Sequence, residues 1–112
     1  MAYDEALANR IRTTLAGDAA LTEKKMFGGV AFLHRGHMFV GVSGSKLMAR
    51  VGKDHYQDSL SRPHVVEMDF TGKPMQGYVF VEPPGIKSDA QLGFWLQRCQ
   101  QFVSTLPPKP TR

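Results

Sequence analysis

The hydrophobic period of this chain changes near residue 30, and no other feature constrains its fold as much. Before that point Leu7, Ile11 and Leu15 recur every fourth residue, which predicts an amphipathic helix over about residues 3–15. Beyond it, runs rich in β-branched, aromatic and methionine side chains follow at 30–33, 38–42 and 47–51. Runs of that length and composition indicate strands.

The segments between these predicted strands decide how the strands pair. Residues 34–37 (HRGH) and 43–46 (SGSK) are short and each contains a glycine. A parallel crossover needs about a dozen residues or more, whereas short glycine-containing segments suit hairpins. The sequence therefore predicts an antiparallel sheet in this part of the chain.

The second half of the chain adds a short helix and two further strands. Asp54 is placed to cap a helix over 54–60, which ends before Pro63 because the residue preceding a proline disfavours helical geometry. Strands are expected at 65–70 and 78–81, joined by a turn rich in glycine and proline.

A final helix is expected to begin at a cap formed by Ser88 or Asp89. Its apolar stripe has spacings of three and four: Leu92, Trp95, Leu96, Cys99, Phe102 and Val103. The elements together predict one α+β domain over 1–106 and a frayed proline-rich tail at 107–112. Two layers are expected, an antiparallel sheet of about five strands with helices on one face, in the order α-β-β-β-α-β-β-α.

Composition excludes several classes of protein. At 112 residues with 42% hydrophobic and 21% charged side chains, the chain is too apolar to be disordered and long enough to bury a core. It has no apolar run near the roughly 20 residues that span a bilayer and no signal-peptide pattern. Its lone cysteine, Cys99, cannot form an internal disulfide, so we expect a cytoplasmic protein. The net charge of +4 is spread over many segments and favours a solvated basic surface.

No motif predicts a catalytic residue, a metal or a cofactor. Residues 41–45 (GVSGS) approach the serine elbow G-x-S-x-G, but Ser45 replaces its last glycine and the segment links two predicted strands. The spacing of the histidines matches no zinc signature. These are His34, His37, His55 and His64. We therefore expect a protein that is not an enzyme.

The stretch 25–32 (KMFGGVAF) is the most distinctive part of the sequence. Gly28 and Gly29 precede a predicted strand, where glycine permits a positive φ or a close backbone approach. Such an approach serves either packing within the domain or a bound ligand, and packing is the favoured interpretation.

Several stretches resemble the N-terminal domain of the TfoX (Sxy) competence regulators and their stand-alone relatives. They are 26–29 (MFGG), the strand from Met38 to Gly44, 46–52 (KLMARVG) and 69–79 (DFTGKPMQGYV). The resemblance covers nearly the whole chain and implies a two-layer fold like that of secretion chaperones and a non-enzymatic regulator acting through protein contacts. Full-length regulators of this family also carry a helical C-terminal domain, and relatives often have an acidic residue where Ser45 stands.

A regulatory or protein-interaction domain is thus the leading hypothesis. Its binding residues are expected to be Met26, Phe27, Gly28, Gly29, Lys46 and Arg50. A protein partner or a second copy, giving a homodimer, would bind these residues or a sheet edge, and no membrane contact is expected.

Two alternatives stay open. The first is a nucleic-acid accessory protein, suggested by the basic pI near 9.5 and by five cations expected to lie near one another. These are Lys24, Lys25, Lys46, Arg50 and Lys53. The second is a small-molecule-binding domain, which would require a deep pocket containing Arg50, His55 and a carboxylate.

Overall fold

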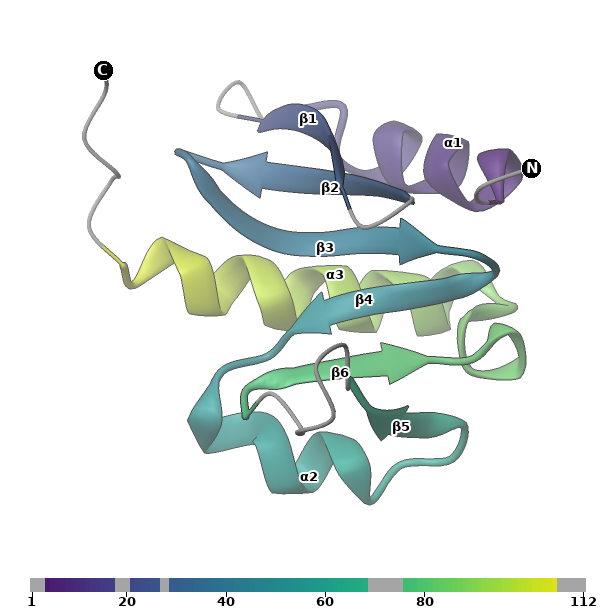
Figure 1. Ribbon diagram of the computed structural model, residues 1–112, viewed down its shortest axis with the longest axis vertical. Helices are drawn as coiled ribbons and strands as arrows, with labels where there is room; N and C mark the ends of the chain where they lie inside the picture. The colour runs from purple at the N-terminus through teal and green to yellow at the C-terminus, as the bar shows by residue number, and fades with distance from the viewer. Residues whose placement is uncertain (1–3, 18–20, 27–28, 69–75, 107–112) are drawn as a thin grey trace.

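The computed structural model describes residues 4–17, 21–26, 29–68 and 76–106, and these form a sheet with helices packed against it (Figure 1). In chain order the elements are α1 (Glu5–Thr14), β1 (Leu21–Met26), β2 (Gly29–His34), β3 (His37–Ser43), β4 (Lys46–Arg50), the 3-10 turn η1 (Lys53–His55), α2 (Tyr56–Leu60), β5 (Val65–Glu67), β6 (Tyr78–Val81), the 3-10 turn η2 (Pro83–Ile86) and α3 (Asp89–Ser104). The α+β class predicted from the sequence is confirmed.

The described strands form one six-stranded antiparallel sheet in the order β1-β2-β3-β4-β6-β5. Strand β1 is one more than the sequence predicted. Its residues 22–25 (TEKK) are all exposed, so it lacks the apolar alternation by which a half-buried strand is recognised. Charged side chains on such an edge strand oppose pairing with other chains.

Two hairpins fix the register of β2, β3 and β4, as predicted. The strands extend further into the connecting segments than expected, so that His34 pairs with His37 and Ser43 with Lys46. In the first turn Arg35 and Gly36 have φ of 54° and 88°, the left-handed pair that matches the twist of a two-residue hairpin.

The main core lies between one face of the sheet and helices α1 and α3; in Figure 1, α3 runs behind the sheet. Helix α1 contributes Leu7, Ala8 and Ile11. The predicted stripe of α3 is buried at Leu92, Trp95, Leu96, Cys99 and Val103. Phe102 departs from the prediction because it is only half-buried. Full burial of each large apolar side chain stabilises the fold by about 1.5–3 kcal/mol.

Both long helices begin at side-chain caps. Asp4 Oδ1 accepts a hydrogen bond from the Leu7 amide at 3.1 Å. Of the two predicted caps of α3, the structure uses Ser88, whose Oγ accepts from the Gln91 amide at 3.0 Å while Gln91 Oε1 accepts from the Ser88 amide at 2.9 Å. This reciprocal pair satisfies two amides that a helix start leaves without partners.

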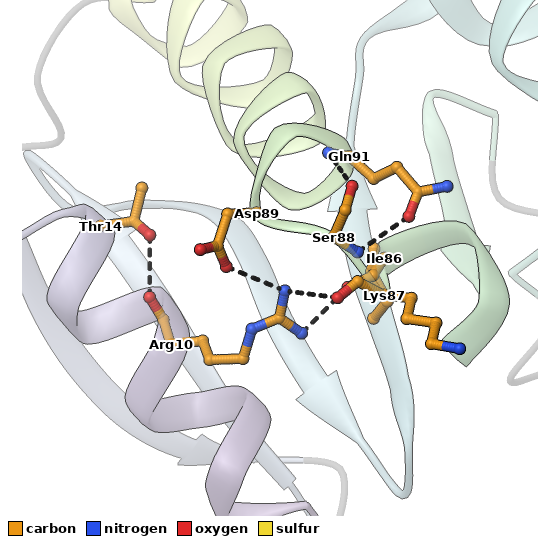
Figure 2. A network of polar contacts seen from close by, with 7 residues as sticks. All are labelled: Arg10, Thr14, Ile86, Lys87, Ser88, Asp89 and Gln91. Carbon is orange, nitrogen blue, oxygen red and sulfur yellow. Dashed lines mark hydrogen bonds and ion pairs between the residues drawn. The ribbon is translucent and has the colours of Figure 1, made fainter.

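Arg10 ties α1 to the turn that precedes α3 (Figure 2). Its Nη1 donates to the carbonyl of Ile86 at 2.9 Å, and its Nη2 donates to the carbonyl of Lys87 at 3.2 Å and lies 3.4 Å from Asp89 Oδ1. One guanidinium therefore satisfies two carbonyls and fixes the relative position of the two helices.

The short helix over 54–60 differs in detail from the prediction. Gly52, with φ of 84°, occupies the N-cap position of η1, and the turn starts at Lys53. Asp54 thus lies inside the first turn, where its side chain caps nothing, and α2 follows from Tyr56 to Leu60. Strand β5 ends at Glu67, ahead of the predicted limit; residues 69 and 70 lie outside the described residues.

Candidate functional site

The predicted site at residues 26–29 lies where β1 meets β2. Met26 and Gly29 are the last pair of that ladder, while Phe27 and Gly28 lie outside the described residues. A Cβ built on Gly29 would collide with the backbone oxygen of Val42 in β3. The close approach of β2 to β3 therefore gives this glycine a packing role.

Lys46 and Arg50 begin and end β4 and point to the same face of the sheet, since they are four positions apart in a strand. Lys46 pairs with Ser43, and Gly29 is one residue beyond the Val30–Val42 pair, so Lys46 shares an end of the sheet with Gly29. Arg50 lies at the opposite end. The six predicted binding residues are thus not gathered at one point.

What connects Lys46 with Arg50 is a pair of aromatic residues on β6. Arg50 pairs with Tyr78 and Met48 pairs with Phe80 across the β4–β6 ladder. The Nζ of Lys46 lies 5.4 Å from the centre of the Phe80 ring, and Cζ of Arg50 lies 5.6 Å from that of Tyr78. We define the cation–aromatic face as the five residues that alternate along β4 and β6 with the residues of the main core: Lys46, Met48, Arg50, Tyr78 and Phe80.

Arg50 is held by two further contacts. Its Cζ lies 5.4 Å from the centre of the Phe102 ring, and its Nη1 donates to the carbonyl of Met38 at 3.3 Å. Phe102 in turn packs on Gly52, where a Cβ would lie 2.5 Å from the ring. The half-buried position of Phe102 therefore serves to orient the guanidinium.

Methionines form the base of the cation–aromatic face. Met48 is fully buried and clusters with Met68 and Phe80. It lies over Gly41, where a Cβ would collide with the Met48 methyl group and lie 2.7 Å from the Val30 carbonyl oxygen. Glycine at this position thus creates the space that the thioether fills.

The cations of this face lie beside aromatic rings. Among the described residues, neither Lys46 nor Arg50 forms an ion pair with a carboxylate. Val66 of β5, which is 39% exposed and pairs with Phe80, extends the apolar area toward the sheet edge. The arrangement offers two uncompensated positive charges beside apolar surface.

The five cations of the nucleic-acid hypothesis do not form one patch. Lys24 shares the cation–aromatic side, but β1 lies three strands from β4, a lateral distance of about 14 Å. Lys25 pairs with Val30 and points to the opposite face. Lys53 lies beyond the end of β4, in η1.

The pocket that the small-molecule hypothesis requires is present only in part. His55 and Asp54 line a cleft of about 480 Å³ with Arg98 and Phe102. Arg50 lines a separate cleft of about 130 Å³. Lys53 and Phe102 belong to both, so the predicted groups lie in two adjoining hollows.

The described residues contain no group of three or more His, Cys, Asp or Glu side chains that could hold a metal ion.

Residues 41–45 form the predicted hairpin between β3 and β4. Burial raises the pKa of the Cys99 thiol. Burial, followed by the charge of Glu67, raises the pKa of Tyr56, whose hydroxyl has no hydrogen-bond partner among the described residues. None of the described helices is long and apolar enough to cross a membrane.

The six predicted binding residues did not include Tyr78 and Phe80, because burial in the core was the favoured interpretation of these aromatic side chains. Their signal was the alternation with Val79 and Val81, which places both rings on one face of a strand. Nothing local indicated that β6 would lie beside β4.

Comparison with known proteins identifies the family. The family model described as the TfoX N-terminal domain matches residues 13–103. No curated protein and no solved structure showed significant similarity to the chain. The match runs from the end of α1 almost to the end of α3 and contains every residue of the cation–aromatic face, and this chain therefore belongs to the TfoX N-terminal domain family.

Proposed function

We propose that this chain is a non-enzymatic regulatory domain that binds a partner protein through the cation–aromatic face. The observation that carries the proposal is the placement of Lys46 and Arg50 beside aromatic rings, with no carboxylate of the described residues paired with either cation. Membership of the TfoX N-terminal domain family supports a regulatory role in general.

The chemistry of the face suits recognition. Arginine and tyrosine are enriched where proteins meet, because each combines a large apolar area with a polar end. The named residues Lys46, Met48, Arg50, Tyr78 and Phe80 include no histidine, cysteine, serine or carboxylate. The partner that complements them carries acidic side chains among apolar ones.

A second copy of the chain is the other partner that the proposal admits. Strand pairing at β1 is opposed by Lys24 and Lys25, and β5 has only three residues. Self-association would therefore use the cation–aromatic face in preference to a sheet edge.

Site-specific photo-crosslinking in cells tests this function. Tyr78 is replaced by a benzophenone amino acid of similar shape, and Gln97, an exposed residue of α3, carries the same group as a control. We expect a defined protein, or a second copy, crosslinked from position 78 only. The crosslink should be lost in the Lys46→Ala/Arg50→Met double variant.

The matched control is the Lys87→Ala/Arg35→Asn variant, which removes two positive charges elsewhere and places asparagine where φ is 54°. It should keep the crosslink. Equal loss in both variants, or a shift of duplex or single-stranded DNA that depends on Lys46 and Arg50, would contradict the proposal in favour of nucleic-acid binding.

A further inference from the structure

A cleft of about 330 Å³, which the proposed function does not use, lies between the segment joining α2 to β5, the turn η2 and the first half of α3. It is lined by Arg62, Pro63, His64, Gly85, Ala90, Gln91, Phe94 and Trp95. Small-ligand sites occupy about 300 to 1,000 Å³, so the cleft has room for a single ring with a side group. No lining residue is acidic.

The apolar part of the cleft is aromatic. The ring centres of Phe94 and Trp95 lie 5.1 Å apart and their planes are nearly perpendicular, at 81°. Pro63 adds an apolar ring at the rim. Such a wall suits a planar ligand, which can lie against the exposed part of Phe94.

The charge at the cleft is positive. The guanidinium carbons of Arg62 and Arg98 lie 4.4 and 4.6 Å from the centre of the Phe94 ring. Both groups donate to the same Asp58 Oδ2, at 3.3 and 2.8 Å. Two positively charged guanidiniums share one carboxylate, so Arg62, Arg98 and Asp58 together carry a net positive charge.

Of the two guanidiniums, that of Arg62 is available to a ligand. The side chain of Arg98 is 14% exposed and also donates to Ser59 Oγ at 3.1 Å. Arg62 is 42% exposed and uses only Nε, so Nη1 and Nη2 have no hydrogen-bond partner among the described residues. These two donors can bind a carboxylate side by side.

His64 supplies an independent indication. Its φ of 66° is in the left-handed region, which a histidine adopts at a cost in free energy, yet its side chain is exposed and adds nothing to the core. Its carbonyl accepts from the Glu82 amide at 2.8 Å. A Cβ on Gly85 would lie 3.2 Å from His64 Cβ and 2.7 Å from Val81 Cγ1, so glycine lets the histidine come this close.

We propose that this cleft binds a small carboxylic acid with a flat apolar body, its carboxylate on Arg62 and His64 and its ring on Phe94. Three observations support this ligand. Asp58 neutralises only one of the two guanidiniums, aromatic rings line the cleft, and the exposed His64 has a left-handed backbone. The site is separate from the cation–aromatic face and does not depend on it.

Trp95, the sole tryptophan of the chain, gives the readout. Its indole N–H resonance in a two-dimensional NMR spectrum is followed while phenylacetate is added to the full chain. We expect a saturable shift, with phenylacetamide and acetate binding at least about tenfold more weakly because each lacks the charge or the ring. Equal shifts with phenylacetate and phenylacetamide would overturn the proposal.

Variants place the binding on the named residues. Arg62→Met removes the guanidinium and keeps an unbranched apolar side chain, so it should weaken phenylacetate binding about tenfold or more, whereas Lys87→Met should not change it. Unchanged affinity in Arg62→Met would exclude the assigned carboxylate site. Lys46→Ala/Arg50→Met should bind phenylacetate normally, which keeps this test independent of the partner protein.

His64→Gly separates function from folding. Glycine relieves the left-handed strain, so the variant should unfold at a higher urea concentration and yet bind phenylacetate several-fold more weakly. A variant that is more stable and binds equally well would contradict a ligand role for the imidazole. A short peptide with a C-terminal phenylalanine presents the same carboxylate and ring. If it binds more tightly than phenylacetate, the natural ligand is a protein C-terminus. If it binds more weakly, the natural ligand is a free acid.

Discussion

The two faces of the sheet use the same strands for different purposes. Alternate residues of β4 and β6 turn toward the helices, and these are Leu47, Ala49, Val79 and Val81, all fully buried. The residues between them form the cation–aromatic face, where Lys46, Arg50 and Tyr78 are half-buried. One side is aliphatic and closed, and the other combines flexible side chains with charge.

The difference between the faces is physical. Valine has one preferred rotamer and packs to a fixed density, which gives the covered face a single arrangement. Lysine and arginine have several rotatable bonds and can adapt to a second surface. Stability is therefore expected to depend mainly on the covered face, and recognition on the other.

Thiol labelling provides the largest contrast. Cys99 is fully buried between α3 and the sheet, and burial raises its pKa, so little thiolate is present to react. With a global stability of about 5 kcal/mol, a disulfide reagent at pH 8 should modify it at least about a thousandfold more slowly than an unfolded thiol. Cys99→Ala/Val66→Cys, which moves the thiol to the other side of the sheet, should react within about tenfold of the unfolded rate. Similar rates at both positions would show that α3 leaves the sheet readily.

A pair of phenylalanine truncations compares the faces energetically. Phe32→Ala removes a fully buried ring from the main core and should lower the free energy of unfolding by about 3–5 kcal/mol. Phe80→Ala affects the smaller cluster with Met48 and Met68 and should cost about 1–2 kcal/mol less. Urea unfolding followed by circular dichroism measures both. Equal losses would mean that the two faces contribute alike to stability.

The covered face was predictable from the sequence because its signals are local. The period of α1, the cap at Ser88 and the alternation at 78–81 each depend on a few neighbouring residues. Strand β1 was missed because it is a charged edge that follows no apolar pattern. The boundary at Asp54 was misplaced because the left-handed Gly52, not a side chain, begins the turn.

The cation–aromatic face was predictable only in part. Lys46 and Arg50 were singled out, but Tyr78 and Phe80 lie 28 or more positions further along the chain than Arg50, counted from their numbers. They reach β4 because β6 pairs with it while β5, which comes first in the chain, takes the edge. Such a non-local choice depends on the packing of the whole domain and leaves no local pattern.

Removal of charge should distinguish the faces by a smaller amount. Lys46→Ala loses one cation–aromatic contact and Arg50→Met loses two, each contact being worth about 0.5–1 kcal/mol of stability. Arg10→Met, between α1 and α3, leaves the carbonyls of Ile86 and Lys87 without their donor and should cost about 1–2 kcal/mol. If Arg50→Met proved the most destabilising of the three variants, the main role of the cation–aromatic face would be to stabilise the fold.

The smallest predicted effect concerns α2, whose Asp58 forms ion pairs with Arg98 of α3 and with Arg62. The hydrogen bond from Arg98, followed by that from Arg62, lowers the pKa of the exposed Asp58 below its ordinary 3.8. A carboxyl with a depressed folded pKa stabilises the fold above its unfolded pKa, and this contribution disappears as the pH falls through the folded pKa. The difference in urea midpoint between the natural chain and Asp58→Asn should therefore be present at pH 6 and shrink below about pH 3.8. In an Arg98→Met background the same difference should be much reduced at pH 6, whereas a full pH response there would show that Asp58 acts through another partner and that α2 is held to α3 by packing alone.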